Sequence, residues 1–344
     1  MRNETRERFN AFRENIATLN GVADASTKFS VDPSIQQKLV DKKQESSAFL
    51  AKVNIVPVVE MKGDVLGLGA PGPNSSRTDT SGAGRRQTRQ LTGLDKFGYE
   101  CSQTNYDTHI RYALLDMWAK FPDFEVRIQN QIVRGQALDN IRIGFNGVMV
   151  AANTDLEDYP NLEDVNVGWL EKMRLQRPTH VMKEGAVEDK VTYGAAGADY
   201  ATLDSLVYDA VNQMLPSWAA EDTELVAICS RDLLHDKYFP LIDQAIDPSE
   251  QIARDVIMST KRLGGLPAAR VPFFPAGTIF VTRFDNLSIY EQEGKRRRHI
   301  KDAPEADRIE DYQSSNDSYV IEDHDYACLI ENIQPYVAPA DPEV

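Results

Sequence analysis

The segment over residues 63–98 constrains most strongly how this chain can fold. It is rich in glycine, shows little apolar periodicity, and carries the basic cluster Arg85-Arg86-Gln87-Thr88-Arg89. Structureless loops of such length are uncommon inside compact domains. We therefore expect an arm that projects from the body of the molecule, with Arg85, Arg86 and Arg89 as candidate contacts to other subunits.

Composition places the chain among folded proteins and limits its partners. Its 344 residues, 42% of them hydrophobic and 26% charged, allow two or three cores of ordinary size. A net charge of −15 argues against tight coating of nucleic acid, so any contact with DNA should be local or loose. The three widely spaced cysteines suggest a reducing cytosol, and the sequence predicts neither a signal peptide nor a membrane span.

The N-terminus predicts a short amphipathic helix. Phe9, Phe12, Ile16 and Leu19 follow one another at spacings of three and four, and the Asn20-Gly21 pair stops a helix. A second helix should start at the proline of the Asp-Pro-Ser stretch and run near 33–50. The first 30 residues look detachable, and we expect neighbouring molecules to order them.

The middle and end of the chain predict a long helix and mixed α/β structure. A stripe of apolar residues at steps of three and four over 121–145 indicates a helix of roughly 37 Å at about 1.5 Å per residue. The segment 52–61 reads as an edge strand because Pro57 cannot donate to a ladder. Short alternating runs from 278 onward predict a C-terminal sheet that packs on the long helix. The expected fold class is α+β.

Candidate catalytic, cofactor and metal motifs all fail on context, so we expect none of these sites. Residues 67–72 match G-x-G-x-x-G, but the prolines that follow preclude the helix that would hold a pyrophosphate. The acidic run over 153–164 lacks the glycine and terminal glutamate of a calcium loop. The stretch 322–325 alternates faces if it is a strand. Trp169, Trp218 and the aromatic pair at 238–239 are expected in the core.

One run is strongly basic, and the sequence leaves its role open between two interpretations. Lys295, Arg296, Arg297 and Arg298 precede a histidine in what looks like a hairpin. They could form an inter-subunit or DNA-facing site, or they could be a solvated turn. The sequence favours neither.

Seven stretches of sequence, spread over nearly the whole chain, carry a resemblance to a known family. They are Met1-Arg2-Asn3-Glu4-Thr5-Arg6, Gln44-Glu45-Ser46-Ser47, Asn54-Ile55-Val56-Pro57-Val58, Val167-Gly168-Trp169-Leu170, Asp199-Tyr200-Ala201, Asp236-Lys237-Tyr238-Phe239-Pro240 and Asn286-Leu287-Ser288-Ile289-Tyr290. In these stretches the chain resembles the Peduovirus-type major capsid proteins (gpN family) of tailed bacteriophages. The resemblance implies the Hong Kong 97-like capsid fold, with N-terminal arm, extended loop, long spine helix, peripheral sheet and α/β axial domain.

The resemblance also implies a role without enzymatic activity. It implies copies arranged as hexamers and pentamers in an icosahedral shell around phage double-stranded DNA. The shell would be built with a scaffolding protein, a maturation protease and a portal protein in the bacterial host cytoplasm. Removal of the N-terminal segment during maturation is implied too, and the family's boundary region matches Lys28, Phe29, Ser30 and Val31. We therefore predict cleavage near Phe29.

The family pattern divides the chain into seven parts. They are a removable scaffold-like segment over 1–30, an N-terminal arm over 31–50, an extended loop over 51–105, a spine-helix region over 106–148, an axial domain over 149–277, a returning sheet of the peripheral domain over 278–333 and a tail over 334–344. Two other functions stay open. One is a host-encoded protein nanocompartment with the same fold, and the other is a nucleotide-binding α/β enzyme that uses the 67–72 loop.

Overall fold

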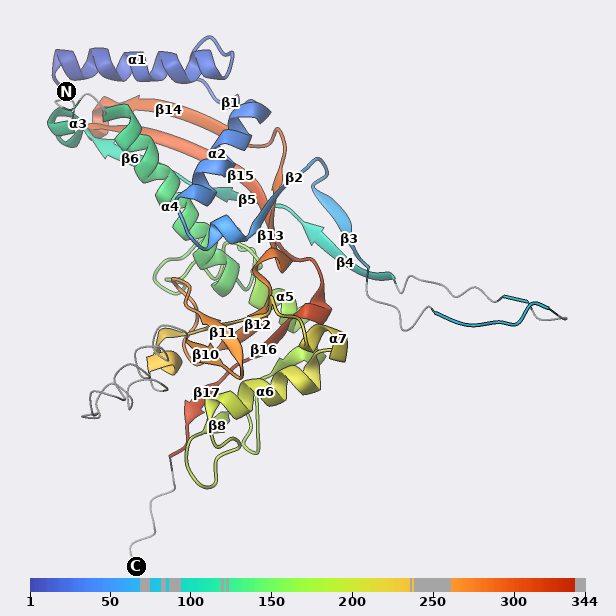
Figure 1. Ribbon diagram of the computed structural model, residues 1–344. Coiled ribbons are helices and arrows are strands. Elements are labelled where there is room, and N and C mark those ends of the chain that lie inside the picture. The colour runs from blue at the N-terminus through green and yellow to red at the C-terminus, as the bar shows by residue number, and fades with distance from the viewer. Residues whose placement is uncertain are drawn as a thin grey trace, which may run out of the picture.

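The structure is a computed structural model that describes residues 1–68, 75–81, 85–86, 94–118, 121, 124–235, 237 and 261–337. Figure 1 shows a helix-covered sheet at one end of the molecule, a second sheet with its own helices at the other, and a hairpin that projects to one side. In the part of the chain described, no helix is both long and apolar enough to cross a membrane. The mixture of helices and sheets confirms the predicted α+β class.

The first sheet is organised around one long central strand. Its order is β1-β14-β15-β13-β2, and β5 and β6 also pair with β15. The strands are β1 (Phe29–Ser30), β2 (Asn54–Val58), β5 (Ser102–Asn105), β6 (Thr108–Arg111), β13 (Leu287–Gln292), β14 (Arg297–Ala303) and β15 (Arg308–Ile321). β2 lies at the edge, as its Pro57 predicts, because proline lacks the amide hydrogen that an inner strand needs.

The described residues at this end of the molecule form four helices: α1 (Asn3–Leu19), α2 (Pro33–Glu45), α3 (Tyr112–Trp118) and α4 (Phe124–Asn146). The predicted helices at both N-terminal sites are confirmed, although α2 ends five residues earlier than expected. Asp32 caps α2 by accepting from the Ser34 amide at 2.8 Å, and Pro33 occupies the first turn. α4 is the predicted long helix, and its Ala137, Ile141 and Phe145 pack in one core with Leu287, Ile289, Tyr319 and Ile321 of the sheet.

The second sheet has the order β10-β11-β9-β12-β16-β7. Its strands are β7 (Val181–Met182), β9 (Val226–Cys229), β10 (Arg262–Leu263), β11 (Leu266–Ala269), β12 (Ile279–Thr282) and β16 (Cys328–Ile330). Helices at this end include α5 (Trp169–Gln176), α6 (Leu203–Met214) and α7 (Ser217–Ala220), and β8 (Val191–Tyr193) pairs with β17 (Ile333–Pro335). Short 3-10 turns are η1 (Leu50–Lys52), η2 (Pro178–His180), η3 (Phe284–Asn286), η4 (Pro304–Ala306) and η5 (His324–Tyr326).

The expectation of one returning sheet over 278–333 is wrong for two of its strands. β12 and β16 lie in the second sheet, where both pair along their length inside the axial region. The reason is burial on both faces: Ile279 and Val281 enter one core, whereas Phe280 between them enters the other. A continuous apolar run of this kind indicates a central strand, and it does not tell which sheet the strand joins.

The described structure includes the base of the expected arm. β3 (Lys62–Leu68) and β4 (Leu94–Glu100) form an isolated two-stranded sheet with Lys62 opposite Glu100, and Figure 1 shows it pointing away from the body. Residues 69–74, 82–84 and 87–93 lie outside the described part of the chain. The prediction of a projecting arm is confirmed for the two strands.

Candidate assembly and processing site

The predicted cleavage region and the basic run lie against each other. β1 pairs antiparallel with β14, with Phe29 opposite Arg298 and Ser30 opposite Arg297. The ladder continues on both sides of the strand, because the Val31 amide donates to the Arg296 carbonyl at 2.9 Å and the Ile300 amide donates to the Ala25 carbonyl at 3.1 Å. The sequence predicted the two segments separately and gave no sign that they meet.

Two further polar contacts hold residues 25–31 against residues 294–300. The Ser30 hydroxyl donates to the Gly294 carbonyl at 2.9 Å, and Nε2 of His299 lies 2.9 Å from the Ser26 carbonyl oxygen. The backbone over 25–31 is thus held along its length by residues 294–300. A protease needs an extended and accessible substrate strand, so the bond near Phe29 is shielded in this conformation.

The N-terminal helix is ordered by its own chain, so the expectation that neighbours must order it is wrong. Phe9, Phe12 and Ile16 of α1 are buried, and they pack with Phe29 and Val31 in a third core. The receiving face is made by residues of α3, α4, β14 and β15, namely Tyr112, Leu115, Ile128, Ile300 and Ile309. The apolar stripe of α1 therefore finds its complement within the subunit. Lys28 and Ser30 stay exposed at the surface.

The basic run leads into the first strand of a hairpin, as expected, and is not a uniformly solvated turn. β14, which begins at Arg297, pairs antiparallel with the next strand, β15, and β13 pairs with the other edge of β15. Arg296 is only 2% exposed, and its guanidinium donates to Glu291 at 2.6 Å and to Oε1 of Gln136 at 2.8 Å. Arg296 was expected to contact other subunits, but its burial means that it contacts residues of its own subunit.

The neighbours of Arg296 in the run differ in exposure. Arg298 forms an ion pair with Asp311 at 2.7 Å and is largely enclosed. Lys295 and Arg297 are exposed, so they stay available as candidate contacts to other subunits. Arg85 and Arg86 are also exposed, whereas Arg89 lies outside the described residues.

A buried charge network surrounds Arg296 where α2, α4 and the sheet meet. Lys43 of α2, Glu291 of β13 and Asp317 of β15 are each at most 3% exposed, and the Tyr106 hydroxyl donates to Asp317 at 3.1 Å. Burial lowers the pKa of Lys43 and raises that of Asp317, and nearby Arg296 and Glu291 respectively add to these two shifts. Burial alone would raise the pKa of Glu291, but Lys43 and Arg296 outweigh it and hold that pKa below its usual range.

Sequence reasoning missed this network because its members come from three separate regions of the chain. Lys43 lies on α2, Glu291 lies on β13 with Arg296 just after that strand, and Asp317 lies on β15 between Asn316 and Ser318. Nothing local in these segments indicates that their charges meet. Buried opposite charges of this kind are costly to separate, so the network fixes α2 against the sheet.

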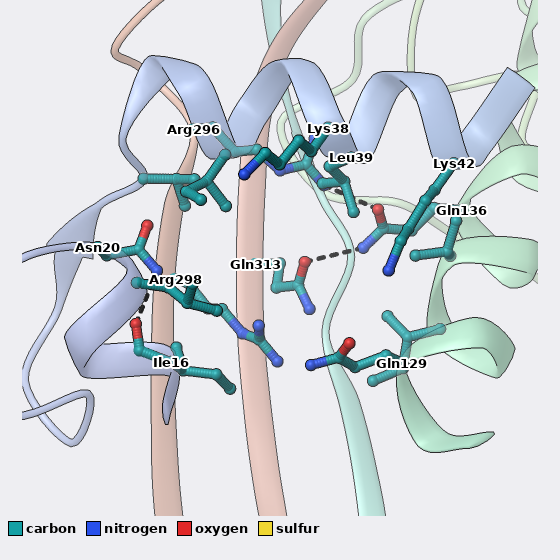
Figure 2. A pocket seen from close by; sticks show the side chains of 15 residues that line it. Ile16, Asn20, Lys38, Leu39, Lys42, Gln129, Gln136, Arg296, Arg298 and Gln313 are labelled. Carbon is teal, nitrogen blue, oxygen red and sulfur yellow. Dashed lines mark hydrogen bonds between the residues drawn. The ribbon is translucent and has the colours of Figure 1, made fainter. Parts of the chain in front are cut away.

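A groove opens beside the network, between α2 and α4 and the end of α1 (Figure 2). Its volume is about 210 Å³, and aliphatic side chains line it together with polar and charged ones, among them Arg296 and Arg298. At its floor, Gln136 donates to Gln313 at 3.0 Å, which Figure 2 shows as a dashed line. Lys38 and Lys42 stand on α2 at its opening.

The motifs considered for catalysis and metals are accounted for by structural contacts where they are described. Asp164 accepts from the Asp155 amide at 2.7 Å, which closes the acidic loop on itself, and the His324 ring packs on Phe97. Across the described ranges, no three His, Cys, Asp or Glu side chains are placed to hold a metal ion. Gly67 is in β3, and residues 69–72 of the glycine motif lie outside the described part.

The aromatic residues expected in the core divide into two groups. Trp169 is fully buried, and its indole donates to the Ser288 carbonyl at 3.1 Å, so this prediction is confirmed. Gly144 permits this packing, because a Cβ there would come within 2.3 Å of the Trp169 ring. Trp218 is 41% exposed and packs edge-on against Tyr326, so its assignment to the core is wrong. Residues 238–239 are outside the described residues.

Known proteins match this chain over nearly its whole length. The family model for the phage major capsid protein of the P2 family matches residues 8–333. The capsid protein of Escherichia phage P2 is 47% identical, with 99% of each chain covered, and the major capsid protein of Serratia phage KSP20 is 37% identical, with 97% of each covered.

Solved structures give the same result for the fold. A chain from the satellite phage P4 procapsid that includes the size determination (Sid) protein superposes with a TM-score of 0.81 at 44% identity, covering 98% of this chain and 99% of that one. The capsid of an empty GTA particle superposes with a TM-score of 0.50 at 16% identity, over 84% and 90% of the two chains, and so agrees in fold alone.

Proposed function

Since the chain belongs to the P2 family of phage major capsid proteins and so builds an icosahedral shell, we propose how its segments act in assembly and maturation. The observation that carries the shell function is a relationship of 47% identity over 99% of both chains. It covers the arm, both sheets and the N-terminal helix together. A nucleotide-binding enzyme is disfavoured, because the family is structural and the 67–72 motif begins inside a hairpin strand.

The first part of the proposal concerns contacts between subunits. Among the described residues, β3 and β4 pair only with each other, so the outer edge of each strand is free to pair with a neighbouring subunit, while Tyr99 of β4 packs on Tyr290 of β13. Exposed Arg85, Arg86, Lys295 and Arg297 supply cations that can pair with other copies, each of which carries a net charge of −15. Copies would associate as hexamers and pentamers. The seven-part division of the chain stays as proposed, except that β12 and β16 join the axial sheet.

The second part concerns maturation by cleavage near Phe29. Cutting there would separate α1 from the rest of the chain, and its departure would uncover the apolar face formed by Tyr112, Leu115, Ile128, Ile300 and Ile309. The bond lies within an edge strand, which a protease can reach only after the strand leaves β14. We expect mature particles to contain chains that begin near residue 29. Mass spectrometry of mature particles would contradict this proposal if residues 1–28 were intact.

The third part concerns partners and place of action. The solved P4 relative is a procapsid with a size determination protein, which supports assembly of this chain with a scaffolding protein. A maturation protease, a portal protein and the host cytoplasm as the place of assembly complete the proposal. The packaged duplex DNA would touch the inner surface loosely, because a subunit with net charge −15 repels phosphates.

A nanocompartment of the host is the second candidate of the same fold. The identity to a phage capsid protein over the full length favours the phage shell. Co-expression of the chain with a scaffolding protein, followed by electron microscopy, tests the choice. Closed shells that require the scaffold support a phage capsid, whereas shells that form alone around a cargo enzyme would support the compartment.

A further inference from the structure

The groove of Figure 2 has the form of a docking site for a helix. α2 and α4 form its long sides, and the last turn of α1 closes one end. Its walls include Ile16, Ile35, Leu39, Ile132 and Val133. At about 210 Å³ it exceeds the roughly 150 Å³ cavity that holds a benzene molecule, so one or two apolar side chains fit inside.

The opening of the groove is positively charged. Lys38 and Lys42 lie one helical turn apart on α2, and both are exposed. Among the described residues neither makes an ion pair, and the nearby Asp41 instead accepts from Gln37 at 3.1 Å. The two lysines give this opening a positive charge, opposite in sign to the net charge of −15 of the whole chain.

We propose that this groove binds an amphipathic helix of an assembly partner that carries acidic residues beside its apolar anchors. Apolar side chains of the partner would enter between α2 and α4, as in other helix-in-groove complexes. Carboxylates four residues apart on the partner would match the spacing of Lys38 and Lys42. This inference rests on the proposed function, because it names the kind of partner that the uncut subunit binds.

The position of the groove indicates that its partner binds before maturation. Ile16, Leu19 and Asn20 precede the proposed cut, so cleavage near Phe29 removes one wall of the groove. A site that is lost on cleavage cannot hold the subunits of the finished shell together. Nucleic acid is also disfavoured, because among the described residues no aromatic ring lines the groove on which bases could stack.

The test measures binding of a labelled peptide to the full-length, uncut chain by fluorescence polarisation. The probe is an 18-residue helical peptide with leucines at helical spacing and glutamates at the flanking positions. A second peptide carries lysines in place of the glutamates, and an 18-nucleotide single-stranded DNA serves as a competitor. We expect the glutamate peptide alone to bind. The double variant Lys38→Glu/Lys42→Glu should bind it about tenfold more weakly or worse.

Two further proteins, a control variant and a cut chain, test whether binding depends on this groove. Lys183→Glu reverses an equally exposed lysine near the second sheet and should bind as the unchanged chain does. The chain cut after Lys28 should lose most of the affinity. Equal weakening by Lys183→Glu, unchanged binding by the cut chain, or equal binding of the lysine peptide would overturn the inference. Competition by the DNA would overturn it too, because it would show that nucleic acid occupies the groove. Because the assay needs neither assembly nor protease, its failure leaves the shell function untouched.

Discussion

Docking of α1 should control how fast the bond near Phe29 can be cut. Phe12 is 6% exposed within the core that also buries Phe29 and Val31. Replacing a buried phenylalanine by alanine costs about 3 to 5 kcal/mol. If this loss falls on α1 docking, the open fraction of residues 25–31 rises about 100-fold or more, since every ~1.4 kcal/mol is a factor of ten.

Trypsin measures this opening without the phage protease, because it cuts after Lys28. In the unchanged chain the bond lies at the start of β1 and is cut only during local opening. The rate at which chains beginning at Phe29 appear, followed by mass spectrometry, should rise about 100-fold in Phe12→Ala. Leu19→Ala removes a 59% exposed side chain from the same helix and should change the rate little. Equal rates in Phe12→Ala and the unchanged chain would refute the reasoning.

Three further predictions follow from the buried groups. Arg296→Met leaves Glu291 buried beside fewer cations, so it should lower the free energy of unfolding, measured in urea, by about 3 kcal/mol. Arg297→Met changes an exposed residue and should lower it by at most about 0.5 kcal/mol. Equal losses in the two variants would contradict the charge network. Hydrogen bonds from Thr192 and from the Ala186 amide lower the pKa of Asp199 below its ordinary 3.8, so they stabilise the 185–200 loop fully above that value. This stabilisation is lost as the pH falls through the lowered pKa, and hydrogen exchange corrected for pH should show faster loop exchange there, but no such change in Asp199→Asn. Burial raises the thiol pKa values of Cys101, Cys229 and Cys328 to about 11 or 12. A thiol reagent at pH 8 should therefore react with these cysteines only after denaturation. Rapid reaction of the native chain would contradict their burial.

Local patterns in the sequence predicted the helices well. The stripe of α1 and the cap at Asp32 involve residues within one or two turns, so their signals do not depend on distant parts of the chain. The edge position of β2 was also predictable, because a single proline determines it. The candidate cleavage region came from family resemblance.

Long-range pairing was not predictable from the sequence. The contact between residues 25–31 and 294–300 joins segments about 270 positions apart, and nothing in either segment specifies the other. The ion pair of Arg296 with Glu291 joins residues only five positions apart, yet it was not predicted either, because a run of basic residues usually indicates a solvated surface. The assignment of β12 to the second sheet needed knowledge of which cores its two faces meet.

Cryo-electron microscopy of the full-length chain co-expressed with its scaffolding protein tests the central claim most directly. The shell function predicts closed icosahedral particles in which the β3–β4 hairpin of each subunit contacts a neighbouring subunit, while α1 stays on its own subunit before cleavage. Dispersed single chains or irregular aggregates, with no closed shells, would contradict it.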